Sequence, residues 1–112
     1  MSTHPTKYLL IESRDPFESN DVAFAYDLAT GLAKAGHDVT VLLVQNGVLP
    51  ARRGARADGL AAVLRAGVKV VADDFSLGER GIDASRLAPG IAPAPIDLVV
   101  DHLAAGHKVV WH

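Results

Sequence analysis

One junction, repeated three times, constrains the fold of this chain more than any other feature. At residues 35–41, 66–72 and 105–111, a helix-compatible stretch reaches Ala-Gly and is followed at once by a valine-rich run. Glycine suits the left-handed residue that ends a helix, because it has no Cβ atom to clash. The runs that follow do not alternate apolar with polar residues, which is typical of strands covered by helices on both faces. Three returns from helix to strand therefore predict an α/β domain.

The length allows one such domain, residues 1–112, because a second would be too small to bury a core. We expect a small three-layer α/β sandwich, with helices on both faces of a mostly parallel sheet of about five strands. The expected strands are residues 7–12, 39–44 and 68–72, a short edge strand near 90–91, and a last strand that includes Val109 and Val110. The expected helices are residues 21–35 and 57–66, a short helix within 73–82 that Gly81 closes, and a last helix that begins near Pro95.

Apolar spacing on these helices predicts which side chains face the sheet. Phe24, Leu28 and Leu32 share one stripe of the first helix. Four residues of the last helix are expected to point inward: Ile96, Val99, Val100 and Leu103. Residues 45–55 are interpreted as a polar turn followed by an irregular loop, because they contain Gly47, Pro50 and Gly54.

Composition narrows the function classes. The formal charge of −2 and the low aromatic content of 5% argue against nucleic acid and anionic membranes as partners. The apolar runs are strand-sized, and no charged-then-apolar leader precedes them, so we expect neither a membrane span nor a signal peptide, and a cytoplasmic location. The sequence contains no cysteine, which excludes disulfides, thiolate metal sites and thiol chemistry on this chain.

Architecture indicates where a ligand would bind. In open parallel sheets, ligands usually bind outside the carboxyl ends of the strands. These ends lead into residues 13–20, 45–55 and 73–77. The polar side chains of these segments are the candidate ligand-binding residues: Arg14, Asp15, Asn20, Gln45, Asn46, Asp73, Asp74 and Ser76.

The order of the motifs also carries a family resemblance. The best markers are Gln45-Asn46-Gly47-Val48, Gly67-Val68-Lys69-Val70 and Arg80-Gly81-Ile82, within a pattern that runs from Tyr8 to Trp111. In this pattern the chain resembles the DsrE/DsrF-like sulfur-relay family, which includes the Tus-type sulfur carriers. The resemblance implies a small α/β fold that assembles into dimers, trimers or hexamers.

The same resemblance places a sulfur-accepting cysteine just after the third strand, eight residues before Gly81. That position is Asp73 here. A carboxylate cannot attack, hold and release sulfur as a thiolate does. We therefore expect a non-catalytic accessory, scaffolding or regulatory protein without a cofactor. It would act as a homo-oligomer or as a partner of cysteine-bearing DsrE-like or sulfur-carrier proteins.

Three interpretations of the acidic pair Asp73 and Asp74 remain open. The structural one is capping, since an aspartate at a helix start accepts backbone N–H bonds. The second is a small-ligand or cation site that also uses Gln45 and Ser76. The third is an enzyme of unfamiliar acid/base chemistry, which would need a carboxylate with a perturbed pKa.

Histidine and arginine residues give weaker signals. His37 and His107 each follow a helix-ending glycine, which indicates a role at the junction, such as bonding to the last helix carbonyls. No His-x-x-x-His or Glu-paired spacing exists, so we expect no metal site. Arginines at positions 52, 53 and 56 form the one basic cluster. It is either a solvated surface or a contact for an anion or an acidic partner.

Overall fold

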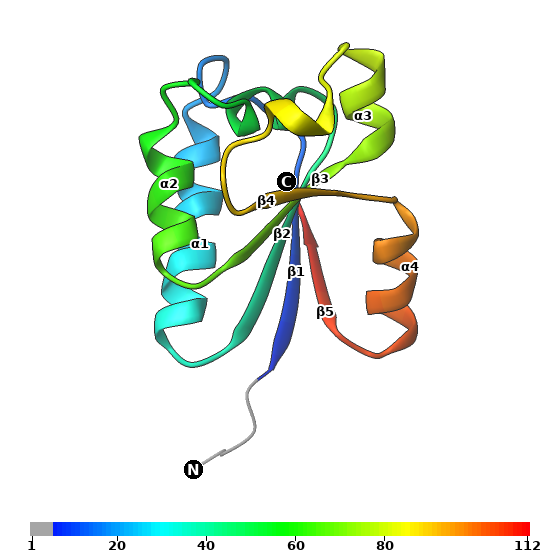
Figure 1. The fold of residues 1–112 in the computed structure, drawn as a ribbon. Coiled ribbons are helices and arrows are strands. Elements are labelled where there is room, and N and C mark those ends of the chain that lie inside the picture. Colours follow the sequence, from blue (N-terminus) through cyan, green and yellow to red (C-terminus); the bar gives the residue numbers. More distant parts are fainter. Residues whose placement is uncertain (1–5) are drawn as a thin grey trace.

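The computed structural model describes residues 6–112 and places a parallel sheet between two layers of helices (Figure 1). The five strands are β1 (Lys7–Glu12), β2 (Asp38–Leu43), β3 (Lys69–Asp73), β4 (Ile91–Ala94) and β5 (Lys108–Trp111). They lie in the order β4-β3-β2-β1-β5, and every neighbouring pair is parallel. The predicted three-layer α/β fold is confirmed.

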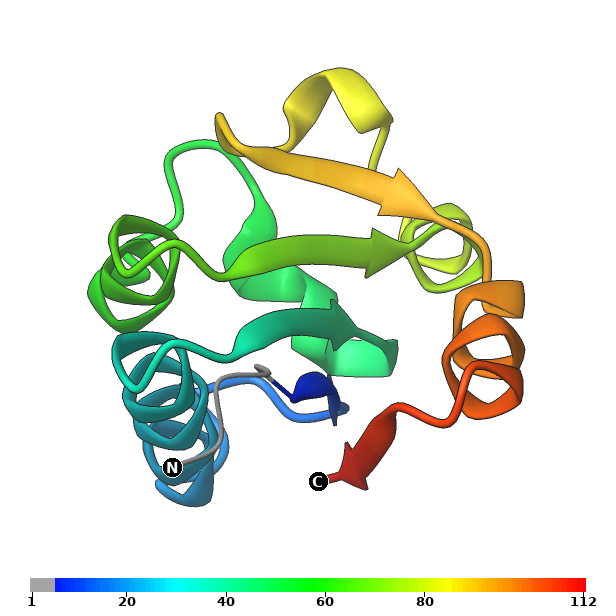
Figure 2. The same ribbon diagram turned by 90° about the horizontal axis from the view of Figure 1, so that it is seen from below.

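The helices divide between the two faces of the sheet. Helices α1 (Asp21–Lys34) and α2 (Asp58–Arg65) cover one face, and α3 (Asp74–Glu79) and α4 (Asp97–Ala104) lie on the other (Figure 2). Two short 3₁₀ helices, η1 (Gln45–Ala51) and η2 (Ala84–Arg86), follow β2 and α3. Gly36, Gly67 and Gly106 have φ values of 94°, 90° and 77°, so all three predicted glycine junctions end their helices in the left-handed conformation.

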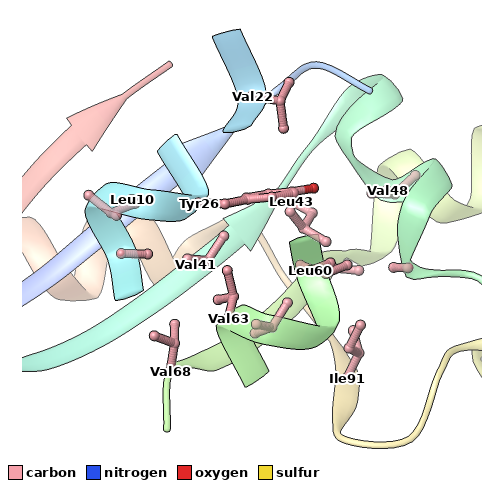
Figure 3. Packing of buried hydrophobic residues seen from close by; sticks show 14 of the residues in the cluster. Leu10, Val22, Tyr26, Val41, Leu43, Val48, Leu60, Val63, Val68 and Ile91 are labelled. Atoms are coloured by element: carbon pink, nitrogen blue, oxygen red, sulfur yellow. The ribbon is translucent and has the colours of Figure 1, made fainter. Parts of the chain in front are cut away.

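The larger core lies under α1 and α2. Leu10 and Val41 on the sheet meet Val22 and Tyr26 of α1 and Leu60 of α2 (Figure 3). The second core, on the α3 and α4 side, is smaller. It contains Leu9, Ile11, Leu42, Val44 and Val71, with Leu98 and Val99 of α4 packed against it. Adjacent residues of β1, β2 and β3 thus enter different cores, which explains the continuous apolar runs.

Both predicted helix stripes need correction. In α1 the buried residues are Val22, Tyr26 and Ala29. Of the predicted stripe, Leu32 packs against the core, whereas Phe24 and Leu28 are 70% and 36% exposed. In α4, Leu98 and Val99 are partly buried, while Val100 and Leu103 are exposed, as is Ile96 at the N-cap position. Each helix carries apolar residues on more than one face, and a single sheet can cover only one of them.

The segment after β2 is more regular than we expected. Residues 45–51 form η1, and Gly47, Val48, Pro50 and Ala51 are buried. A Cβ atom at Gly47 would collide with the backbone oxygen of Glu12. The Gly47 N–H also donates to Ser13 O at 3.2 Å. Glycine at this position therefore lets η1 pack directly against the end of β1.

Candidate functional site

Asp73 ends β3 at the carboxyl edge of the sheet and begins α3. Its side chain is 5% exposed. The Ser76 N–H and the Ser76 hydroxyl both donate to Asp73 Oδ2, at 3.0 and 2.7 Å. This is the N-cap geometry that satisfies an otherwise unpaired helix donor. The structural interpretation of Asp73 is therefore confirmed.

The N-cap of α3 is also hydrogen-bonded to the segment that follows β2. The Gln45 N–H donates to Ser76 Oγ at 2.8 Å, so Ser76 accepts from the first residue of η1 while it donates to Asp73. Gln45 has a φ of 51°, which is uncommon for a residue other than glycine. This short hydrogen-bond chain fixes the first residue of η1 against the start of α3.

Asn46 and Arg80 extend the polar contacts on the same edge. The Arg80 guanidinium donates to Asn46 Oδ1 through Nε at 3.2 Å and through NH2 at 3.0 Å. It also donates to Ser76 O at 3.2 Å. The Asn46 amide lies 3.4 Å from Glu18 Oε1. Four predicted site residues, Gln45, Asn46, Asp73 and Ser76, are thus brought together, with Arg80 as a member that we did not predict.

The other predicted residues do not bond to this group within residues 6–112. Arg14 lies 3.8 Å from Asp21 in an exposed ion pair. Buried Asp15 accepts from the Phe17 N–H at 3.1 Å. Asn20 stands at the N-cap position of α1 but makes no side-chain capping bond. Instead Ser19 Oγ accepts from the Asp21 N–H at 3.3 Å. Asp74 is exposed in the first turn of α3.

A second titratable group at this edge was not found from the sequence. Glu12, the last residue of β1, is 2% exposed, and the His112 Nδ1 lies 2.8 and 2.9 Å from its two carboxylate oxygens. The Tyr26 hydroxyl is buried and has no partner within the described residues. Burial raises the pKa of Tyr26 well above its ordinary value, and the charges of Glu12 and Asp15 add to this increase. Only the parallel pairing of β1 with β5 brings Glu12 and His112 together, so no local motif could indicate them.

His37 and His107 contact the helix-end carbonyls through their backbone N–H groups, whereas their imidazole rings have other partners. His37 Nδ1 accepts from the Thr6 N–H at 3.1 Å, and His107 Nδ1 lies 2.9 Å from His102 Nδ1. The His37 N–H donates to Leu32 O and the His107 N–H donates to His102 O, so the backbone makes the predicted bonds to the last helix carbonyls. Among residues 6–112, no three His, Cys, Asp or Glu side chains lie close enough together to hold a metal ion.

Comparisons with known proteins agree with this architecture. The model of the DsrE/DsrF-like family matches residues 6–111. The chain belongs to the DsrE/DsrF-like family. Asp73 of this DsrE-like chain stands where the resemblance placed the cysteine, at the carboxyl end of β3. No curated protein matches the chain. None of the helices in residues 6–112 has the length and apolar character to cross a bilayer.

Three solved structures show the same fold at low identity. The protein of unknown function MTH1491 from Methanobacterium thermoautotrophicum is 16% identical, with a TM-score of 0.84 over 96% of this chain and 99% of that chain. The ychN protein from E. coli is 18% identical, with a TM-score of 0.85 over the same shares. BT1422 from Bacteroides thetaiotaomicron, of unknown function, is 17% identical, with a TM-score of 0.74 over 94% of both chains. At these identities the likeness concerns the fold alone.

Proposed function

We propose that this protein is a non-catalytic DsrE-like module that acts through assembly, as a scaffold or regulator related to sulfur-relay proteins. Sulfur relay needs a thiolate that attacks a sulfur donor and later releases the sulfur. The sequence contains no cysteine. The module would therefore support proteins that carry the thiol, in the cytoplasm, without transferring sulfur itself.

The observation that carries this proposal is the use made of Asp73. Its Oδ2 atom accepts two bonds from Ser76 and so caps α3. The residue at the position of the sulfur-accepting cysteine, Asp73, therefore stabilises the fold by capping α3. The scaffold is otherwise retained from β1 to β5, which is expected of a protein whose surface matters more than its chemistry.

Assembly is supported by an apolar groove between α1 and β5, hereafter the α1–β5 groove. Exposed side chains on its wall include Phe24, Leu28, Val110 and Trp111. Phe24 and Trp111 are 70% and 63% exposed. Neighbouring exposed apolar side chains of this size are typical of protein interfaces. The groove therefore favours contact with a second copy of the chain or with a cysteine-bearing relative.

The two edges of the sheet differ in a way that favours the β5 side. Strand β4 contains Pro93 and is followed by Pro95, and proline blocks the addition of a further strand. Strand β5 (Lys108–Trp111) contains no proline. Its outer backbone groups can pair with another chain beside the α1–β5 groove.

Size-exclusion chromatography with light scattering tests assembly. The wild type at micromolar concentration should have a mass of two, three or six chains, and Phe24→Glu should shift it toward the monomer. Phe17→Glu is the matched control, because Phe17 is 72% exposed and does not line the groove. A strictly monomeric wild type that also retains no cysteine-bearing DsrE-like protein in a pull-down would refute the proposal.

One observation favours a second candidate, a small cation or polar-ligand site at Asp73. Its Oδ1 atom is buried without a hydrogen-bond partner in the described residues, and such oxygens need a water or a cation. A thermal-shift screen with Mg²⁺ and Ca²⁺ tests this function. A rise in melting temperature that Asp73→Asn abolishes would support it, and no rise in the wild type would eliminate it.

A further inference from the structure

A basic cavity lies between two segments that are distant in the sequence, residues 52–55 and 80–86. Its volume is about 560 Å³, within the range of small-molecule sites. Arg52 and Arg53 line it from the segment after η1, and Arg80 and Arg86 line it from the segment after α3. We propose that this arginine cavity binds a small anion that carries phosphate groups. The inference is independent of the proposed assembly.

All charged side chains that line the cavity are positive. Four of its lining residues are arginines and none is acidic, although the whole chain has a formal charge of −2. Two carboxylates lie close to these arginines in the sequence. Glu79 lies 4.0 Å from Arg80, and Asp83 accepts from the Ser85 N–H at 3.0 Å. This hydrogen bond, together with the charge of Arg86, lowers the pKa of Asp83. Four cations gathered around one hollow repel each other, and an anion bound between them would relieve that repulsion.

Two of the four guanidinium groups make no hydrogen bond within the described residues. Neither Arg53 nor Arg86 makes a side-chain hydrogen bond or ion pair with residues 6–112. The other two are anchored. Arg52 Nε donates to Leu49 O at 2.8 Å, and Arg80 is held by Asn46 and Ser76. Anchored and free guanidinium forks together suit bidentate binding of phosphate oxygens.

Backbone hydrogen bonds hold the two segments of the cavity together. The Arg53 N–H donates to Arg86 O at 2.6 Å, and the Ala88 N–H donates to Ala51 O at 2.8 Å. Arg52 and Leu87 form an antiparallel bridge between the same two segments. A ligand would therefore order side chains rather than loops, which lowers the entropy cost of binding.

Charge and size identify the ligand class. A phosphate group carries nearly two negative charges and three acceptor oxygens, so two phosphates can engage four guanidinium groups. No aromatic residue lines the cavity, so no ring is available to stack on a nucleobase. Diphosphate and sugar bisphosphates fit these features better than nucleotides or monocarboxylates.

Isothermal titration calorimetry in low-salt buffer tests the proposal with three probes: inorganic diphosphate, fructose 1,6-bisphosphate and citrate. Diphosphate or the bisphosphate should bind at one saturable site, more tightly than citrate, and the affinity should fall as salt is added. A comparison of the affinities for diphosphate and for fructose 1,6-bisphosphate shows whether the sugar contributes to binding. Arg53→Gln and Arg86→Gln should each weaken binding about tenfold, since each removes one charged fork.

Arg65→Gln is the matched control, because Arg65 is exposed at the end of α2 and does not line the cavity. It removes the same charge and should leave the affinity unchanged. The exposed positions of Arg53 and Arg86 allow both variants to fold, which circular dichroism would verify. The proposal is overturned by a lack of saturable binding, by citrate that binds as tightly as both phosphates, or by an equal loss in the Arg65→Gln control.

Discussion

Replacing Asp73 by alanine tests whether this carboxylate serves the scaffold. The change removes both hydrogen bonds that Ser76 donates to Oδ2, at 3.0 and 2.7 Å. It also removes the buried Oδ1 atom that has no partner in the described residues. The first effect destabilises the fold, and the second partly offsets it.

The magnitude follows from these contacts. Loss of an N-cap costs about 0.5–2 kcal/mol, and a hydrogen bond to a charged group contributes roughly 1.5–3 kcal/mol. Relief of an unsatisfied buried oxygen returns about 1–3 kcal/mol. We expect Asp73→Ala to lower the free energy of unfolding by about 1–3 kcal/mol, and each kcal/mol lowers the melting temperature of a domain of this size by roughly 3–6 °C.

Urea denaturation with three variants provides the assay. Asp73→Asn keeps an oxygen acceptor at the cap and should cost about 1 kcal/mol or less. Asp74→Ala is the control, because exposed Asp74 contributes only a helix-dipole interaction of about 0.3–1 kcal/mol. An Asp73→Ala protein as stable as the wild type, or more stable, would refute the capping argument. Such a result would mean that the carboxylate is kept for function at a cost in stability.

Two further predictions concern packing and pH. Gly47→Ala should lower the free energy of unfolding by about 2 kcal/mol or more, because its Cβ would collide with the Glu12 backbone oxygen. Gly31→Ala in α1, where an added Cβ would meet no other atom within 4 Å, should raise the free energy of unfolding by about 0.5–1 kcal/mol. Urea denaturation that gives the same change for both variants would contradict this packing argument. The pKa of His102 is lowered by burial and by His107, so the unfolded chain binds this proton more readily. Stability should therefore fall as the pH drops below about 6.5. Melting curves between about pH 8 and pH 5 should show a smaller fall in stability for His102→Gln, and an unchanged fall would exclude the titration of His102 as its cause.

The sheet could be predicted from the sequence because its signals are local. Each Ala-Gly junction ends a helix and starts a strand, and Gly36, Gly67 and Gly106 all adopt positive φ values. The site edge followed from the same logic, since parallel strands bring their carboxyl ends together. Asp73 and Ser76 are three residues apart, so a capping role could also be predicted.

Contacts between distant segments could not be predicted in this way. Glu12 meets His112 only because β5 returns beside β1, and Arg80 reaches Asn46 across 34 residues. The apolar stripe with Phe24 failed for a different reason. Helix α1 has a second apolar face, and periodicity alone does not reveal which one a single chain buries. The exposed face contributes to the α1–β5 groove, through which we propose that the protein assembles.

Intact-mass spectrometry after incubation with a persulfide donor tests most directly whether this scaffold lacks sulfur chemistry. The wild type should keep its mass, because it has no cysteine and Asp73 is a carboxylate. Asp73→Cys provides the positive control, and its thiol should gain one sulfur atom that a reductant removes. A covalent sulfur adduct on the wild-type chain would contradict the account.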